Sequence, residues 1–345
     1  MEKRSYYALD VTKYICAFLV IMIHTAPFAN INTNLHMWTT QIFARTAVPL
    51  YFIIAGYLFF SKIDMQREWN DQANIYRLKR YSMRILTIYG VWSLVYFPIR
   101  MISLYQANFT FEAIFSLVRD ILFLGTYYHL WFLPALIIGL WIVYVLCRWC
   151  SMKQIIIYTL CLYLIGMGFN IYLPMINNIP IVSTLCDIYQ KVFVTTRNGF
   201  FFAPIFIALG AYYANVEISL RYSLKKSIYT CIGAFILYIL EACILQRYHL
   251  LTDYTCMYAT LLIFCPSVLL VLLQIHLSKR KIYLYMRKTS LLIYVSHLLF
   301  IIVCGTLFPD FSLWEVYLFS CICSIIFSTI VYVSMKKFKI LEILC

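Results

Sequence analysis

The chain has 345 residues, of which 63% are hydrophobic and 12% are charged, and its mean hydropathy is +0.82. A water-soluble core of this size cannot bury so much apolar surface, so the composition excludes a soluble globular protein and predicts an all-α, polytopic integral membrane protein. The formal net charge of +14 does not indicate a nucleic-acid-binding protein, because the basic residues form short clusters between apolar stretches.

Ten apolar stretches are each expected to cross about 30 Å of hydrocarbon as a helix. If the N-terminus is cytoplasmic, the inner loops contain all but six of the 28 Lys and Arg residues, so the positive-inside rule predicts that both termini are cytoplasmic. The six outer residues are Arg45, Arg100, Arg119, Lys191, Arg197 and Arg247. The expected spans are residues 14–30, 40–61, 82–104, 131–147, 154–172, 198–215, 227–246, 254–275, 289–308 and 314–335.

The rest of the sequence bears on the number of spans and on the domain organisation. The amphipathic segment 113–124 is open between a re-entrant or interfacial helix and a further span. No long linker, internal repeat or low-complexity tract interrupts the sequence, so residues 1–345 are expected to form a single transmembrane domain. A cleaved signal peptide is not expected, because residues 25–29 make a poor cleavage site.

The first span contains the best candidate for a catalytic residue. Ten nearly all apolar residues separate Lys13 from His24, which places the imidazole about 16 Å further along a helix. An ionisable group inside a bilayer is costly and usually marks a substrate, ion or proton pathway. Lys13 is open between a contact to a cytoplasmic substrate and an anchor at the inner surface.

The second span carries a cation and two helix-shaping residues. Arg45 lies near its outer end, where the guanidinium is suited to bind a carboxylate, a phosphate or a carbonyl oxygen, or else snorkels to the outer headgroups. Pro49 is expected to kink the helix. Gly56 is better explained by close helix packing than by a functional motif.

A basic row follows on the cytoplasmic side. Arg77, Arg80 and Arg84 are spaced three and four residues apart, so they align on one face of a helix. Such a row is suited to hold the phosphates of a nucleotide-like donor. The alternative is that these residues only record the inside-positive topology.

Four further polar residues are candidates for substrate binding, each with a structural alternative. Glu241 is the only acid deep in a span, so it is protonated, paired with an Arg such as Arg197, or functional. His297 is open between a packing histidine and a second catalytic group. His129, next to Trp131, and Arg197 are open between substrate contacts and interfacial anchors.

The thirteen cysteines have no framework spacing, so neither disulfides nor a metal site is expected. Cys147 and Cys150 form a CxxC motif, but no second pair accompanies it.

In their order and spacing, these motifs resemble acyltransferase family 3, whose members are integral-membrane O-acyltransferases. The likeness extends along the chain, and the N-terminal 135 residues carry most of it. Ala55 departs from the family pattern, in which Ser more often precedes the Gly. The chain is also similar to the membrane part of vancomycin-resistance serine racemases, although no racemase domain is expected within residues 1–345. The matching residues are Leu9 and Asp10 with Lys13 and His24, the segment 45–52 with Gly56 and Tyr57, the Arg77 and Arg80 pair, and the segment 129–133.

This resemblance implies a transferase that moves groups other than aminoacyl groups, most simply acetyl, from cytoplasmic acyl-CoA. The donor phosphates would bind Arg77, Arg80 and Arg84, with Lys13 nearby. His24 would take a proton from a hydroxyl or accept the acyl group itself, and Arg45 would stabilise the oxyanion.

The implied acceptor is a cell-surface carbohydrate or a small hydroxyl compound, reached directly or through a separate extracytoplasmic transferase. The implied location is a bacterial cytoplasmic membrane. Two alternatives are kept: a secondary transporter or small-molecule uptake protein, for example for serine, and a non-catalytic structural or sensory protein.

Overall fold

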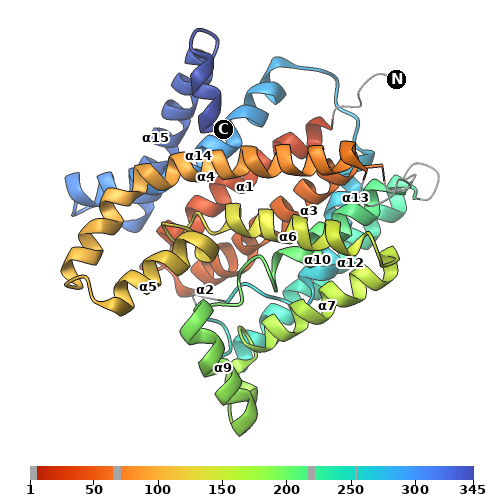
Figure 1. Ribbon diagram of the computed structural model, residues 1–345, viewed down its shortest axis with the longest axis horizontal. Helices are drawn as coiled ribbons and strands as arrows, with labels where there is room; N and C mark the ends of the chain where they lie inside the picture. The colour runs from red at the N-terminus through yellow and green to blue at the C-terminus, as the bar shows by residue number, and fades with distance from the viewer. Residues whose placement is uncertain (1–5, 65–70, 217–221, 253–254) are drawn as a thin grey trace. The chain divides into compact units, whose positions relative to one another are not determined.

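The computed structural model describes residues 6–64, 71–216, 222–252 and 255–345. Within these ranges every regular element is a helix (Figure 1). The all-α class expected from the composition is therefore confirmed.

Each of the ten stretches expected from the sequence overlaps one apolar helix. Six are long and apolar enough to cross a membrane, and four are shorter, which confirms a polytopic membrane protein. The long ones are Tyr7–Thr25 (α1), Thr33–Phe60 (α2, Thr33–His36; η1, Met37–Phe43; η2, Ala44–Thr46; α3, Ala47–Phe60), Gln72–Gln106 (α4), Leu224–Arg247 (α12), Lys281–Leu307 (α14) and Leu313–Ser334 (α15), and the shorter ones are Phe132–Leu146 (α6), Met152–Gly168 (α7), Ala203–Ala214 (α10) and Leu261–Gln274 (α13).

The first helix is displaced from its expected bounds of 14–30. It begins at Tyr7, because polar residues in its first turns pair with one another and extend the helix beyond the apolar stretch. It ends at Thr25, because Ala26 adopts a left-handed conformation with φ of 46° and Pro27 follows.

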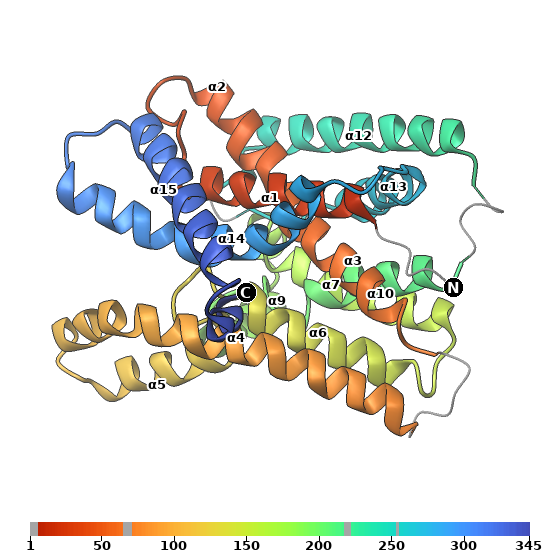
Figure 2. The same cartoon turned by 90° about the horizontal axis from the view of Figure 1, so that it is seen from above.

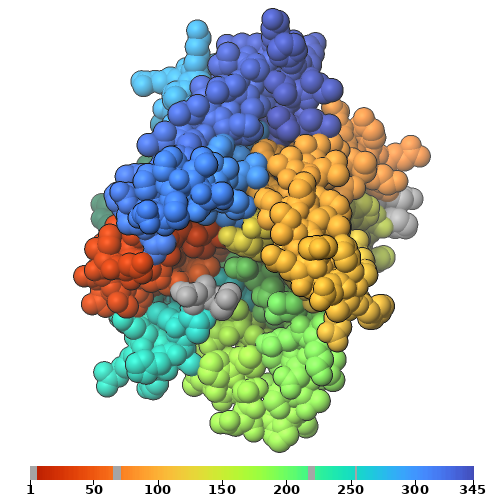
Figure 3. Space-filling model, turned by 90° about the vertical axis from the view of Figure 1, so that its left-hand side faces the viewer, coloured from red at the N-terminus to blue at the C-terminus, as the bar shows by residue number. Residues whose placement is uncertain are grey.

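The segment that the sequence left open, 113–124, is not a span. It forms α5 (Phe111–Arg119), which has nine residues, followed by the π-helical turn η3 (Asp120–Leu124). Even together, α5 and η3 rise only about 20 Å, which is less than the hydrocarbon thickness of about 30 Å. Phe111, Phe115 and Val118 expose much of their side chains, and the space-filling view shows this part of the chain at the surface (Figure 3). These features are typical of an interfacial helix.

The polar stretch before α10 contains a helix that the apolar pattern did not indicate. It is α9 (Pro180–Phe193), preceded by the short α8 (Leu173–Ile176). Near the C-terminus, Lys339–Leu344 forms the 3₁₀ helix η4.

Contacts divide the chain into two compact units. Unit 1 comprises Met1–Tyr51, Glu217–Cys243 and Ile263–Cys345, and unit 2 comprises Phe52–Val216 and Ile244–Leu262. In unit 1, α1, α14 and α15 pack on one another (Figure 2), and η1 and η2 pack against α1. Their shared core contains Ala17, Ile21, Ile293 and Cys321.

Unit 2 is held together by contacts of α6 with α4 and α10, and of α10 with α7. α3 crosses α10 at two glycines. A methyl group added to Gly56 would lie 2.6 Å from the carbonyl oxygen of Ile207, and one added to Gly210 would overlap the carbonyl oxygen of Ile53. The close helix packing expected at Gly56 is confirmed.

Candidate functional site

The His24 ring stacks on the ring of His297 in unit 1. Their centroids are 5.2 Å apart and their planes differ by 27°. His24 lies in the last turn of α1 and is half-buried, whereas His297, on α14, is fully buried. α1 and α14 form a close pair, so two residues 273 positions apart meet inside the unit.

The backbone fixes the tautomer of a neutral His297. Its Nδ1 lies 2.6 Å from the carbonyl oxygen of Tyr294. A carbonyl oxygen only accepts hydrogen bonds, so Nδ1 carries the proton and Nε2 carries the lone pair of the neutral ring. His297 therefore has an orientation and a proton position set by its own helix.

Arg45 is buried, with 6% of the residue exposed. Its terminal nitrogen and its Nε donate to the side-chain oxygen of Gln41, at 2.7 and 3.3 Å. The π-helical turn η1 ends just before η2, the 3₁₀ turn that carries Arg45 and packs against α1. Such turns re-aim side chains and are frequent at functional sites. A role in catalysis stays a prediction.

Lys13 belongs to an ion-pair cluster at the N-terminal end of α1. Its ammonium lies 3.0 Å from the carboxylate of Asp10, which is 3% exposed. Arg287 of α14 donates to the same carboxylate from Nε at 2.8 Å and from a terminal nitrogen at 2.7 Å. This cluster joins α1 to α14 at the end of α1 opposite to the histidine pair. A contact of Lys13 with the donor stays a prediction.

Arg77, Arg80 and Arg84 are all exposed on the N-terminal part of α4. Arg77 donates to the carbonyl oxygen of Lys62 at 2.6 Å. Nearby, the buried side chain of Asn74 bonds the backbone of Asp64 through both of its ends. These bonds hold the segment after α3 against the start of α4. Arg77, Arg80 and Arg84 stay exposed at the protein surface.

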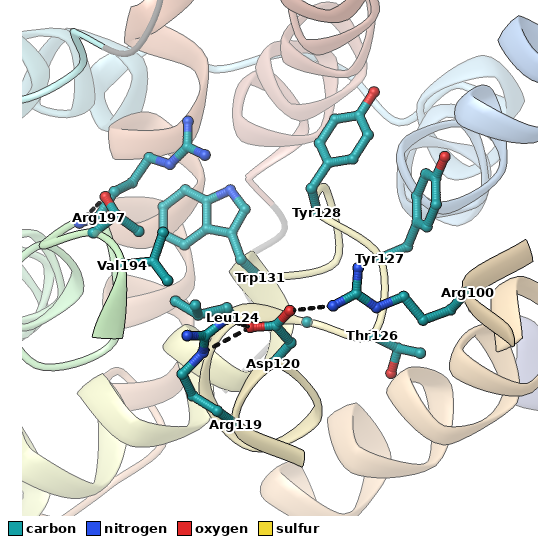
Figure 4. Close-up of a pocket in the computed structure, with 12 residues that line it drawn as sticks. Arg100, Arg119, Asp120, Leu124, Thr126, Tyr127, Tyr128, Trp131, Val194 and Arg197 are labelled. Carbon is teal, nitrogen blue, oxygen red and sulfur yellow. Dashed lines mark hydrogen bonds and ion pairs between the residues drawn. The ribbon is translucent and has the colours of Figure 1, made fainter. Parts of the chain in front are cut away.

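A cavity of about 280 Å³ lies in unit 2, between the C-terminal part of α4, the segment 119–131 and the segment 194–197 (Figure 4). Arg197 is one of its lining residues. His129 is buried and packs edge-on against Tyr96, with ring centroids 4.8 Å apart. The sequence did not single out this cavity, although its cations were visible as exceptions to the positive-inside bias.

Glu241 is 9% exposed and lies in α12, within unit 1. One turn earlier, Tyr238 donates to the carbonyl oxygen of Ile42 at 2.7 Å. Because Arg197 belongs to unit 2, the pairing of Glu241 with Arg197 stays a prediction. In the described ranges, no group of three or more His, Cys, Asp or Glu residues is placed to hold a metal ion.

Comparison with known proteins shows to which family the chain belongs. The family model described as "Acyltransferase domain", of acyltransferase family 3, matches residues 6–333. Two amino-acid racemases of Enterococcus faecalis are 33% identical over 205 residues and 31% identical over 212 residues, which are 59% and 61% of this chain. A serine/alanine racemase of Enterococcus gallinarum is 29% identical over 203 residues, or 59% of the chain.

In each case the match covers 28% of the racemase, so the chain spans little more than a quarter of the length of these relatives. No solved structure matches. The family model, by contrast, extends over nearly every element described above, from the start of α1 to the end of α15, and the chain belongs to acyltransferase family 3.

Proposed function

We propose that this membrane acyltransferase moves an acyl group, most simply acetyl, from cytoplasmic acyl-CoA to a hydroxyl of a cell-surface carbohydrate or a related small acceptor. The observation that carries the proposal is the His24 and His297 pair, which sits on two membrane helices of a chain matched along its length by an acyltransferase model. Stacked imidazoles in an apolar unit are costly to retain unless they are used.

The reaction needs one base and one oxyanion stabiliser. The acceptor oxygen attacks the thioester carbonyl while His24 takes its proton, so that a C–O bond forms and the C–S bond breaks. The imidazolium then returns the proton to the leaving thiolate of CoA. His297 holds the His24 ring by stacking, and Arg45 supplies donors to the negative oxygen that develops on the carbonyl.

The donor is proposed to bind at the start of α4. Arg77, Arg80 and Arg84 present three exposed guanidiniums, and guanidiniums bind phosphate oxygens in a two-pronged geometry. Lys13 would add a further cation near the inner surface. It is part of the same proposal that the donor is acyl-CoA, that the acyl group is acetyl and that the membrane is the cytoplasmic membrane.

Uptake of a small molecule such as serine is the second candidate. It rests on a relative whose name, serine/alanine racemase, identifies serine as a substrate of that protein; that this chain takes up serine is the proposal. An uptake protein requires no acyl donor, so the two functions separate in one pair of assays.

The test uses membrane vesicles from cells that express the full chain, supplied with acetyl-CoA labelled in the acetyl group. We expect label in the envelope fraction, and its loss by about 100-fold or more in His24→Ala at equal abundance. His276→Ala is the matched control, because His276 is exposed outside the pair. Equal labelling by His24→Ala, or accumulation of labelled serine in vesicles free of acyl-CoA, would reject the transferase.

A further inference from the structure

The cavity in unit 2 carries an excess of positive charge. Its lining includes Arg100, Arg119 and Arg197 and a single acid, Asp120, which together have a formal charge of +2. These three arginines are half of the six cations that the inside-positive pattern leaves on the outer side. The inside-positive bias predicts few cations on that side, so these three arginines need a separate explanation.

Two of the arginines are held in place by the acid. Arg100 donates to one oxygen of Asp120 at 2.6 Å, and Arg119 donates to the other oxygen from two nitrogens, at 2.9 and 2.7 Å. Figure 4 shows the two side chains approaching Asp120 from different elements. One carboxylate thus orders two guanidiniums and neutralises only one of them. The trio keeps a positive charge and further N–H donors.

The third arginine has a buried donor left over. The Arg197 guanidinium lies 5.1 Å from the centre of the Trp131 ring, which fixes it by a cation–π contact. Its Nε is buried and has no hydrogen-bond acceptor among the residues that the structure describes. A buried donor of this kind costs free energy unless a ligand accepts its hydrogen bond.

Hydrogen bonds hold the backbone that presents Arg197. Asn198, which is 1% exposed, accepts from the backbone N–H groups of Phe200 and Phe201 and donates to the carbonyl oxygen of Thr195. The backbone N–H of Arg197 donates to the Thr195 hydroxyl at 3.1 Å. The side chain therefore starts from a fixed position, as a binding residue should.

The rest of the lining suits an organic molecule with a polar group. Tyr127 and Trp131 offer ring surface, and burial raises the pKa of the Tyr127 hydroxyl, partly opposed by the charge of Arg100. That hydroxyl stays protonated at neutral pH and is available as a donor. A cavity near 280 Å³ is at the small end of ligand pockets.

We propose that this cavity binds a small anionic molecule through its carboxylate or phosphate group, and that this molecule carries the hydroxyl that is acylated. The second clause rests on the proposed function. The position agrees with it: Arg77 and Arg100 are 23 residues apart on α4, or about 35 Å along the helix axis. The donor row and the cavity thus stand at opposite ends of one membrane-length helix.

The binding test uses the purified full chain in lipid nanodiscs without acyl-CoA and three probes that share one sugar ring: glucose, glucuronate and glucose 6-phosphate. We expect calorimetry to show binding of at least one anionic probe, tenfold or more tighter than glucose. Comparing the affinities for glucuronate and glucose 6-phosphate shows whether the site prefers a carboxylate or a phosphate group. Equal affinity for glucose, or no binding of either anion, overturns the proposal.

Variants separate the cavity from general surface charge. Arg197→Gln should weaken anion binding tenfold or more, whereas Arg247→Gln, which removes an exposed outer arginine, should not. If Arg197→Gln does not fold, Arg197→Lys keeps the charge but not the planar fork, and it should still weaken binding severalfold. Unchanged affinity in the folded variant overturns the proposal.

A further variant distinguishes this inference from the proposed function. His24→Ala should bind the anion with unchanged affinity but transfer no acyl group to it. If the wild-type protein binds the anion and Arg197→Gln does not, but the anion is never acylated, the binding site stands and its assignment as acceptor fails. Loss of anion binding in folded His24→Ala would contradict a site confined to unit 2.

Discussion

His24 and His297 stack with their ring centroids 5.2 Å apart, and the backbone carbonyl of Tyr294 holds the proton of His297 on Nδ1. His297→Gln should therefore lower kcat about tenfold to 100-fold, a smaller loss than that of His24→Ala, because it removes the support of the base and not the base itself. The KM for acyl-CoA should change little. Labelled acetyl transfer at several acyl-CoA concentrations measures both quantities.

A structural role alone would give a different result. If His297 only fills space, His297→Gln would lower the abundance or thermal stability of the protein and leave kcat per folded molecule unchanged. Comparing activity with the folded fraction, measured by size-exclusion chromatography, separates the two outcomes.

The carboxylate of Asp10 accepts bonds from Lys13 and Arg287 while being almost fully buried. Asp10→Asn should lower the free energy of unfolding by about 1–3 kcal/mol, since it leaves two cations without their counter-charge while Arg287 keeps partial access to solvent. Thermal unfolding in detergent measures the effect. In the double variant Asp10→Asn with Arg287→Gln, part of the loss should be recovered; strictly additive losses would show that the two side chains do not interact.

α3 and α10 approach each other at Gly56 and Gly210, where an added methyl group would meet backbone atoms. Gly56→Ala should reduce thermal stability, because backbone atoms cannot move aside as a flexible side chain does. Gly90→Ala is the matched control, since a Cβ there meets nothing within 4 Å, and it should be neutral or stabilising by up to about 1 kcal/mol. Equal melting temperatures for the two variants would contradict the close crossing.

The sequence predicted the class, the ten apolar helices and the place of His24 in the first of them, because hydrophobic run length and an isolated polar residue are local properties. It left the partner of His24 open. His297 was visible as a polar residue in a span, but only the packing of α1 on α14 shows that the two rings meet.

Interactions between distant segments account for most of what was missed. Asp10 and Lys13 are three residues apart and their pairing is readable, whereas Arg287 lies 277 residues beyond Asp10. The cavity of unit 2 combines three segments that are separated in the sequence, and Asp120 gave no signal of its own. Its arginines did give one, since the positive-inside rule places them on the side where the predicted topology has few cations.

The exposed row on α4 gives the prediction that tests the donor side. Arg77→Ala with Arg80→Ala should raise the KM for acyl-CoA by about tenfold or more, because each lost guanidinium removes charge-assisted bonds to phosphate. The KM for the acceptor should not change, since the row lies about 35 Å along α4 from Arg100.

Lys336→Ala with Lys337→Ala removes two exposed cations near the C-terminus and serves as the control for general charge. Raising the salt concentration should increase the KM for acyl-CoA in the wild-type protein and in the control, but much less in the double arginine variant, because screening acts only on contacts that are present. If only the KM for the acceptor changed, or if the KM for acyl-CoA depended on salt to the same extent in all three proteins, the donor would not bind to this part of α4.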